Sequence, residues 1–137
     1  MPFIEIKPED IAAAAAVIPQ NTPVYMVNLL RYRQRAEYAG GSELQPCSGR
    51  EAYTQRYVPA SRALAASDGI KVFWLGAVLS GVVVPAGERW DDIGIVEYPA
   101  FAAFQRIVES PDYRAQAEPH RKAALADWRL IATTRLA

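Results

Sequence analysis

Cysteine and histidine are almost absent from this chain of 137 residues, which has one of each, Cys47 and His120. A single cysteine excludes an internal disulfide and suits a reducing compartment. One cysteine with one histidine also makes a dedicated zinc site unexpected, because such sites draw on several of these side chains. Neither glycine-rich phosphate motif, the P-loop type or the dinucleotide type, is present. We therefore expect no metal and no cofactor.

An excess of charge of one sign is missing as well, since 15 basic and 15 acidic side chains cancel. Without a basic stripe, the chain lacks the usual electrostatic signature of nucleic-acid binding. No hydrophobic run approaches the roughly 20 residues of a membrane span, and the N-terminus lacks the pattern of a signal peptide. Because 51% of the residues are hydrophobic, the chain is expected to fold. The composition predicts one cytoplasmic domain, residues 1–137, that binds neither nucleic acid nor membrane.

Residues 1–22 are expected to form an N-terminal extension that contains a helix. Pro8 suits the first position of a helix, and Glu9 and Asp10 favour its dipole. The alanine-rich run that follows has high helix propensity, and Pro19 then stops the helix.

The segment PVYMVNLLRYR, residues 23–33, is the clearest strand. Apolar side chains occupy both of its faces, so both faces are expected to be buried. Asn28 is the polar exception within it. The polar residues 33–47 predict an exposed loop, which at this length is often functional or mobile.

Proline and capping residues mark the helices of the remaining chain. Ser48 with Glu51 fits a capping box, and Ser110 with Pro111 fits the start of a later helix. We expect Pro59 to kink or split the helix that begins at the capping box.

The later strands are less regular in sequence. Residues 70–84 form a strand region with two glycines, so we expect a bend or bulge near Gly76 or Gly81. The third strand is predicted at about residues 89–98, and the last strand at residues 128–136.

The order strand, helix, strand, strand, helix, strand is that of a ferredoxin-like α+β sandwich, with its core at residues 23–135. Two helices would cover one face of a four-stranded sheet. The other face is apolar too, and without a cover it would form a large exposed hydrophobic patch. We therefore predict a homodimer through this sheet face. Alternatively, the N-terminal helix covers part of that face.

Several ordered blocks of this sequence resemble a known family. They are PVYMVNLLRYR (23–33), CSGREAYTQRY (47–57), WDDIGIVEYPAFAAF (90–104), ESPDYRAQAEPHRKAALAD (109–127) and RLIA (129–132). Together they cover most of residues 23–133 and are similar to the domain-of-unknown-function 1330 family of small bacterial proteins. The resemblance implies ferredoxin-like subunits that pair into a dimeric α/β barrel without an established activity. The same broad fold group includes cofactor-independent monooxygenases, haem-degrading enzymes, isomerases and dehydratases, so the fold does not define the function.

His120 is the first candidate for a catalytic residue, because its ordinary pKa lies near neutral pH and suits proton transfer. Pro119 is expected to interrupt the helix just before it, leaving free N–H groups that attract anions. Arg121 would then bind an anionic group of the substrate while His120 moves a proton. Alternatively, both side chains are solvated on a helix surface, or His120 forms a bond across the dimer.

Four further residues are candidates for binding a small molecule. Asn28, if buried, either faces a ligand or ties strand to strand. Tyr57, Trp90 and Tyr113 belong to an aromatic set that either lines a pocket or simply fills the core.

These residues are compatible with three kinds of protein. The first binds or converts a small organic acid or carbonyl compound in a cavity between sheet and helices, with cofactor-free oxygenation as one candidate chemistry. The second is a non-catalytic dimeric module, structural or stress-associated, that has no pocket. The third binds haem through His120. A cavity with convergent polar groups would favour the first.

Overall fold

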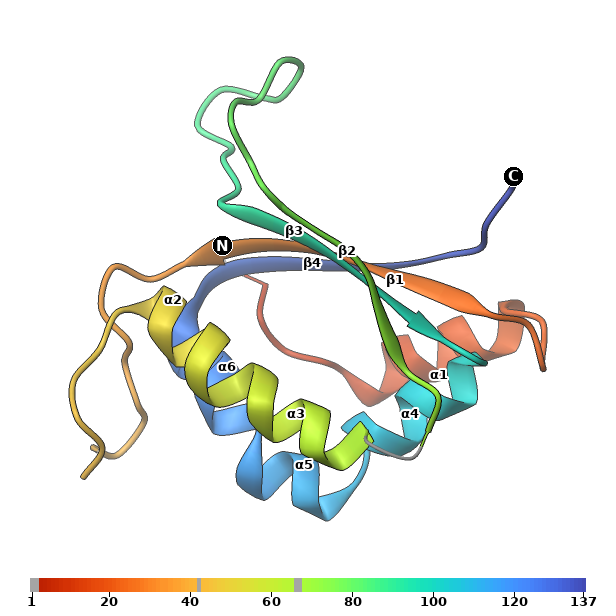
Figure 1. The fold of residues 1–137 in the computed structure, drawn as a ribbon, viewed down its shortest axis with the longest axis horizontal. Helices are drawn as coiled ribbons and strands as arrows, with labels where there is room; N and C mark the ends of the chain where they lie inside the picture. The colour runs from red at the N-terminus through yellow and green to blue at the C-terminus, as the bar shows by residue number, and fades with distance from the viewer. Residues whose placement is uncertain (1–2, 42, 66–67) are drawn as a thin grey trace.

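The structure is a computed structural model that describes residues 3–41, 43–65 and 68–137. Residues 1 and 2 of the predicted extension and residue 42 of the predicted loop lie outside the described residues. Four antiparallel strands form one sheet in the order β2-β3-β1-β4 (Figure 1). The strands are β1 (Val24–Tyr32), β2 (Lys71–Ala77), β3 (Asp92–Tyr98) and β4 (Leu125–Thr133). This element order and strand order confirm the predicted ferredoxin-like α+β sandwich.

The helices all lie on one side of the sheet (Figure 1). In chain order they are α1 (Pro8–Val17), α2 (Gly49–Glu51), the π-helix η1 (Ala52–Tyr57), α3 (Val58–Ala65), α4 (Phe101–Val108), α5 (Pro111–Gln116) and α6 (Glu118–Ala124). None of the helices in the described ranges is long and apolar enough to cross a membrane.

The helix starts predicted from capping residues are confirmed. The Ser48 hydroxyl accepts a bond from the Glu51 backbone N–H at 3.0 Å, and the Glu51 carboxylate accepts one from the Ser48 N–H at 2.9 Å. Ser110 likewise caps α5 by accepting from the N–H of Tyr113. The expected interruption near Pro119 is also present, because α5 ends at Gln116 and α6 begins at Glu118.

Pro59 is predicted to kink or split its helix, and the structure changes from the π-helix η1 to α3 at Val58, one residue before it. The chain passes through it within α3, and the irregular part is the π-helix η1 immediately before it. Proline has no backbone N–H, so it cannot form the usual hydrogen bond to the preceding turn. The wider π turn of η1 directly before Pro59 accommodates the loss of this bond.

The second strand differs from its prediction. It ends at Ala77, and its bulge lies between Val72 and Trp74, not near Gly76 or Gly81. Residues 78–91 leave the sheet as a protruding segment, called the arm below, so β3 begins only at Asp92. In Figure 1 the arm rises from the sheet on the side away from the helices.

The last strand begins earlier than predicted, at Leu125. Its pairing with β1 continues to Tyr32, opposite Leu125. The neighbouring carbonyl of Ala124 accepts a bond from the Arg33 N–H, so the pairing holds up to the end of α6.

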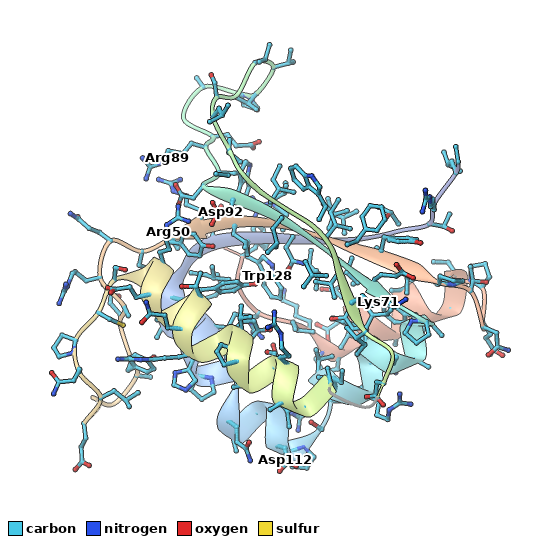
Figure 2. The ribbon with its side chains drawn as sticks, in the orientation of Figure 1. Arg50, Lys71, Arg89, Asp92, Asp112 and Trp128 are labelled. Carbon is cyan, nitrogen blue, oxygen red and sulfur yellow. The ribbon has the colours of Figure 1, made fainter. Side chains whose placement is uncertain are left out.

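The two faces of the sheet have different environments. On the helix side, Met26 and Leu30 of β1 are buried together with Trp128 of β4. The position of Trp128 between sheet and helices can be followed in Figure 2. The opposite face, called the open face below, carries an apolar set from all four strands. Its members are Tyr25, Val27, Leu29, Phe73, Trp74, Ile93, Ile95 and Ile131.

Helix α1 does not cover the open face, so that alternative is wrong. Ile11 of α1 packs with Met26, Phe101 and Phe104 in a cluster on the helix side. Figure 1 accordingly shows α1 beside α4, below the sheet. No helix of the described chain therefore covers the open face.

Candidate functional site

A cavity of about 570 Å³ lies between the sheet and the helices. This volume is within the usual range of small-molecule sites. Its walls come from β1, β2, β3 and β4 on one side and from η1, α3, α4 and α5 on the other. Most of the lining is apolar, and its aromatic members are Tyr53, Tyr57, Tyr98, Phe104, Tyr113 and Trp128.

A chain of hydrogen bonds runs from a buried arginine to the wall of this cavity. Arg121 of α6 has no exposed surface, and its Nη1 donates to the hydroxyl of Tyr113 at 2.6 Å. The hydroxyls of Tyr113 and Tyr57 are 2.8 Å apart. Both tyrosines line the cavity. The set of Arg121, Tyr113 and Tyr57 is called the relay below.

The direction of the relay follows from the chemistry of its members. A guanidinium has donors only, so the Tyr113 oxygen accepts from Arg121. The hydroxyl proton of the buried Tyr113 then needs an acceptor, and the Tyr57 oxygen is the one that the described residues provide. The Tyr57 proton is thereby left free to donate into the cavity.

Tyr113, Tyr53 and Tyr98 in the cavity wall keep their protons at neutral pH. Burial raises the pKa of Tyr113 well above its ordinary value, and the nearby Tyr57 raises it further, although Arg121 opposes the shift. Burial likewise raises the pKa of Tyr53 and of Tyr98. These hydroxyls therefore act as donors, not as bases, near pH 7.

Ser61 adds a second polar group beside Tyr57. The two residues are four apart in sequence, which places them on the same side of a helix. Both line the cavity, and the Ser61 hydroxyl is buried without a partner among the described residues. Together they form a polar corner in an otherwise apolar space.

Arg121 is held firmly behind this corner. Its Nη2 donates to the carbonyl of Ile4 at 3.0 Å, and its guanidinium lies 4.8 Å from the Trp128 ring centre. Burial works to lower the pKa of Arg121, but the Tyr113 and Tyr57 hydroxyls outweigh it, and the pKa rises above its ordinary value. The side chain is thus a fixed positive charge.

Asn28 is buried and lines the cavity, but its amide is already engaged. Its Oδ1 accepts from the indole N–H of Trp128 at 3.0 Å, and its Nδ2 donates to the carbonyl of Gly94 at 3.2 Å. These bonds join β1 to both of its neighbouring strands. The geometry therefore matches the interpretation of Asn28 as a tie between strands.

The structure does not bring His120 together with Arg121. The His120 ring is half-buried beside the loop of residues 33–47, where its Nδ1 lies 2.7 Å from the Tyr38 hydroxyl. Arg56 donates to the same hydroxyl at 3.1 Å. Burial lowers the pKa of His120, and the charge of Arg56 lowers it further. His120 is not among the described residues that line the cavity, so neither acid–base chemistry in the cavity nor haem ligation there is supported by its position.

Trp90 also lies away from the cavity lining. It stands at the base of the arm, where its indole N–H donates to Glu88 at 3.4 Å and the Arg129 guanidinium lies over its ring. Of the six predicted site residues, the structure thus places Tyr57, Tyr113 and Asn28 in the lining of the cavity and Arg121 behind Tyr113, and leaves His120 and Trp90 away from it.

Sequence reasoning missed Ser61 and Trp128 as members of the site. The spacing of four residues from Tyr57 was a usable signal for Ser61, because it predicts a shared helix face. No comparable signal marked Trp128, since its place next to Asn28 depends on strands that are distant in sequence.

A smaller cavity of about 390 Å³ lies under the N-terminal segment. It is lined by α1, by the residues before it and by α4 and β4, including Lys7, Asp10, Phe101 and Arg129. Within the described ranges, no group of three or more His, Cys, Asp or Glu side chains is placed to hold a metal ion.

The comparison with solved structures first defines the class of fold. A DABB family protein with a ferredoxin-like fold from Mesorhizobium loti matches with a TM-score of 0.52 at 16% identity, over 84% of this chain and 98% of that one. At this identity the match supports the ferredoxin-like fold alone.

The same comparison then identifies the family. The RPA0582 protein of Rhodopseudomonas palustris, described as a protein of unknown function, is 34% identical with a TM-score of 0.86, over 100% of this chain and 99% of that one. A structure of the methylated RPA0582 protein is 35% identical with the same TM-score, over 99% and 96%. The chain therefore belongs to the same family as RPA0582. No protein-family model and no curated protein matches it.

Proposed function

We propose that this protein binds a small organic acid or carbonyl compound in the cavity between sheet and helices, and that it does so as a cytoplasmic homodimer. The observation that carries the proposal is the relay, which presents the Tyr57 proton to an apolar, aromatic space. An oxygen acceptor on a ligand would complete the hydrogen bonds of Tyr57 and of the unpartnered Ser61 hydroxyl.

Binding is favoured over acid–base catalysis at this site. Among the lining residues that the structure describes, none is Asp, Glu, His or Cys. Lys71 and Arg62 supply the charged groups of the lining, and both are exposed. The relay itself donates a hydrogen bond and has no group suited to accept a proton at neutral pH.

The homodimer is supported by the open face and the arm. Trp74 and Ile131 of the open face are about half exposed. The Trp74 ring packs directly on Gly76, so closely that a Cβ atom at position 76 would collide with the ring. Leu79, Val82 and Val83 of the arm are between 92% and 97% exposed. A second copy would bury both surfaces at once, because the arm stands on the same side as the open face (Figure 1).

Membership of the domain-of-unknown-function 1330 family and its dimeric α/β barrel are part of the same proposal. They rest on the sequence blocks at residues 23–33, 47–57, 90–104 and 109–127. The cytoplasmic location rests on the single cysteine.

A thermal-shift screen of small organic acids and carbonyl compounds tests the binding proposal. We expect compounds that raise the melting temperature of the wild-type protein, followed by calorimetric titration of the best one. Tyr57→Phe should weaken its binding by about 10-fold, the value of one hydrogen bond of roughly 1.4 kcal/mol. Tyr53→Phe is the matched control, because it removes a hydroxyl from the same wall but leaves the relay intact.

A cavity-filling variant locates the ligand. Ala65→Phe adds a ring at the lining of α3 and should abolish binding while the protein remains folded. Unchanged binding in both Tyr57→Phe and Ala65→Phe would contradict the proposed site.

A further inference from the structure

Arg121 is completely buried, yet it makes no ion pair with any carboxylate in the described part of the chain. Its two terminal nitrogens donate to neutral acceptors, the Tyr113 hydroxyl and the Ile4 carbonyl. Its Nε is buried and has no hydrogen-bond partner among the residues that the structure describes. Glu118, on the same helix, acts on it only from a longer distance and is itself paired with Lys122 at 3.4 Å.

A buried charge in this position is costly. The effective penalty for burying one ion is several kcal/mol, and proteins normally offset it with a buried partner of opposite charge. The contacts of the guanidinium with the Tyr113 and Trp128 rings offset part of it. A full counter-charge is missing among the described residues.

The relay connects this charge to the cavity. A guanidinium that donates to Tyr113 polarises the Tyr113 hydroxyl, which in turn polarises the Tyr57 hydroxyl, because hydrogen bonds in a chain strengthen one another. The free proton of Tyr57 is thus a stronger donor than that of an isolated tyrosine. The apolar lining lowers the local dielectric and strengthens the attraction for negative charge.

We infer that the ligand oxygen held by Tyr57 is an anion, either a carboxylate or the ionised form of an enol or phenol, and that it supplies the counter-charge that Arg121 lacks. This inference rests on the proposed function and adds the charge state of the ligand to it. Both hydroxyls of the polar corner, Tyr57 and Ser61, donate to that oxygen or to its partner oxygen. The protein stabilises the charge through these hydrogen bonds, and burial raises the pKa of Tyr113, so that residue keeps its proton behind Tyr57.

Two consequences distinguish an anion from a neutral ligand. A carboxylate should bind more tightly than its amide, which has nearly the same shape and also offers an oxygen acceptor. A phenol should ionise at a lower pH when it is bound, because the site favours its charged form.

The experiment uses benzoate, benzamide and 4-nitrophenol with the whole protein. Calorimetric titration at pH 7.5 should show benzoate binding at least about 10-fold more tightly than benzamide, in line with a charge-assisted bond. The absorbance of 4-nitrophenol, followed against pH, should show that the pKa of the bound phenol is at least about one unit below that of the free phenol.

Tyr113→Phe is the decisive variant, because it interrupts the relay but keeps the ring and the arginine. It should reduce the preference for benzoate over benzamide to about 3-fold or less, because the charge of Arg121 no longer acts on the ligand through the relay. Tyr38→Phe, which removes a hydroxyl outside the cavity lining, should retain the full preference. Arg121→Met should behave like Tyr113→Phe. The arginine also donates to the Ile4 carbonyl, and loss of this bond can destabilise the fold. If Arg121→Met fails to fold, Tyr113→Phe alone decides the outcome.

The possible outcomes separate this inference from the proposed function. Equal binding of benzoate and benzamide, both weakened by Tyr57→Phe, overturns the anion and leaves the cavity site standing. A preference for benzoate that survives Tyr113→Phe overturns the role of the relay. Failure of the wild-type protein to bind any of the three probes overturns the inference together with the proposed site.

Discussion

Trp128 donates its indole N–H to the Oδ1 of Asn28 across a separation of 100 residues, at 3.0 Å. The bond is buried, and it joins β4 to β1 at the position where Asn28 also reaches β3 through Gly94. One amide therefore holds three of the four strands together beneath the cavity.

Asn28→Leu should destabilise the protein by about 1–3 kcal/mol. The substitution leaves the Trp128 indole N–H buried without an acceptor, and that cost is of this size. Urea unfolding followed by fluorescence gives the free energy of unfolding. Trp128→Phe should also destabilise, because it leaves Asn28 Oδ1 unpaired and opens a cavity. The double variant should cost less than the sum of the two single variants, and strict additivity would contradict a direct interaction.

Gly49, the first residue of α2, lies in close contact with the backbone just after β1 and at the end of α6. Its N–H donates to the carbonyl of Arg33, and an added Cβ atom would lie within 3.0 Å of backbone atoms of Arg33 and Ala124. Gly49→Ala should therefore destabilise the protein by about 1–3 kcal/mol, the usual cost of overpacking.

The matched comparison for Gly49 is Ser48→Ala at the adjacent position. It removes the cap of α2 without adding volume and should cost about 1 kcal/mol. A stability of Gly49→Ala equal to that of the wild type would show that the backbone can move apart at this junction.

His120 should make the stability fall as the pH drops below the ordinary histidine pKa of about 6.5. Burial and Arg56 lower its pKa in the folded state, so the unfolded chain binds the proton more readily. Stability is then complete above the unfolded pKa of about 6.5 and falls as the pH drops from there toward the folded pKa. Because His120 is the sole histidine, His120→Gln should flatten the urea-unfolding free energy over this range.

Tyr38→Phe provides the control for the pH effect. It removes the hydroxyl that bonds to His120 Nδ1 but leaves the burial and Arg56 in place. The pH dependence should persist in this variant. If the wild type and His120→Gln showed the same pH dependence, another group would be responsible.

The fold was predictable because its signals are local. The alternation in residues 23–33 predicts a strand with two apolar faces, and the caps at Ser48 and Ser110 mark helix starts that need no distant partner. The bulge of β2 was misplaced because glycine marked the expected position, whereas pairing with β3 sets the actual one. The arm is predicted as strand because its valines suit a strand, although Val82 and Val83 lie outside the four strands of the described chain.

The site was only partly predictable because it depends on side-chain directions. His120 and Arg121 are neighbours in sequence, which suggested a joint role, but successive residues of a helix differ in direction by about 100°. Arg121 turns into the core and His120 turns toward Tyr38. The bond of Tyr113 to Tyr57 crosses from α5 to η1, and no spacing in the sequence encodes it.

Charge placed on the arm should break the proposed dimer. Val82 and Val83 are more than nine-tenths exposed, so within one copy they lose nothing when they are replaced by lysine. In a dimer each buried valine contributes about 1.5–3 kcal/mol, so Val82→Lys with Val83→Lys should weaken association by about 100-fold or more. Sedimentation equilibrium at micromolar concentration measures this weakening of association directly.

Val17→Lys is the matched control, because Val17 is 79% exposed at the end of α1, on the helix side of the sheet. The control should remain dimeric. A wild-type protein that sediments as a monomer, or a double variant that stays dimeric while Val17→Lys dissociates, would show that the arm and the open face are not the interface.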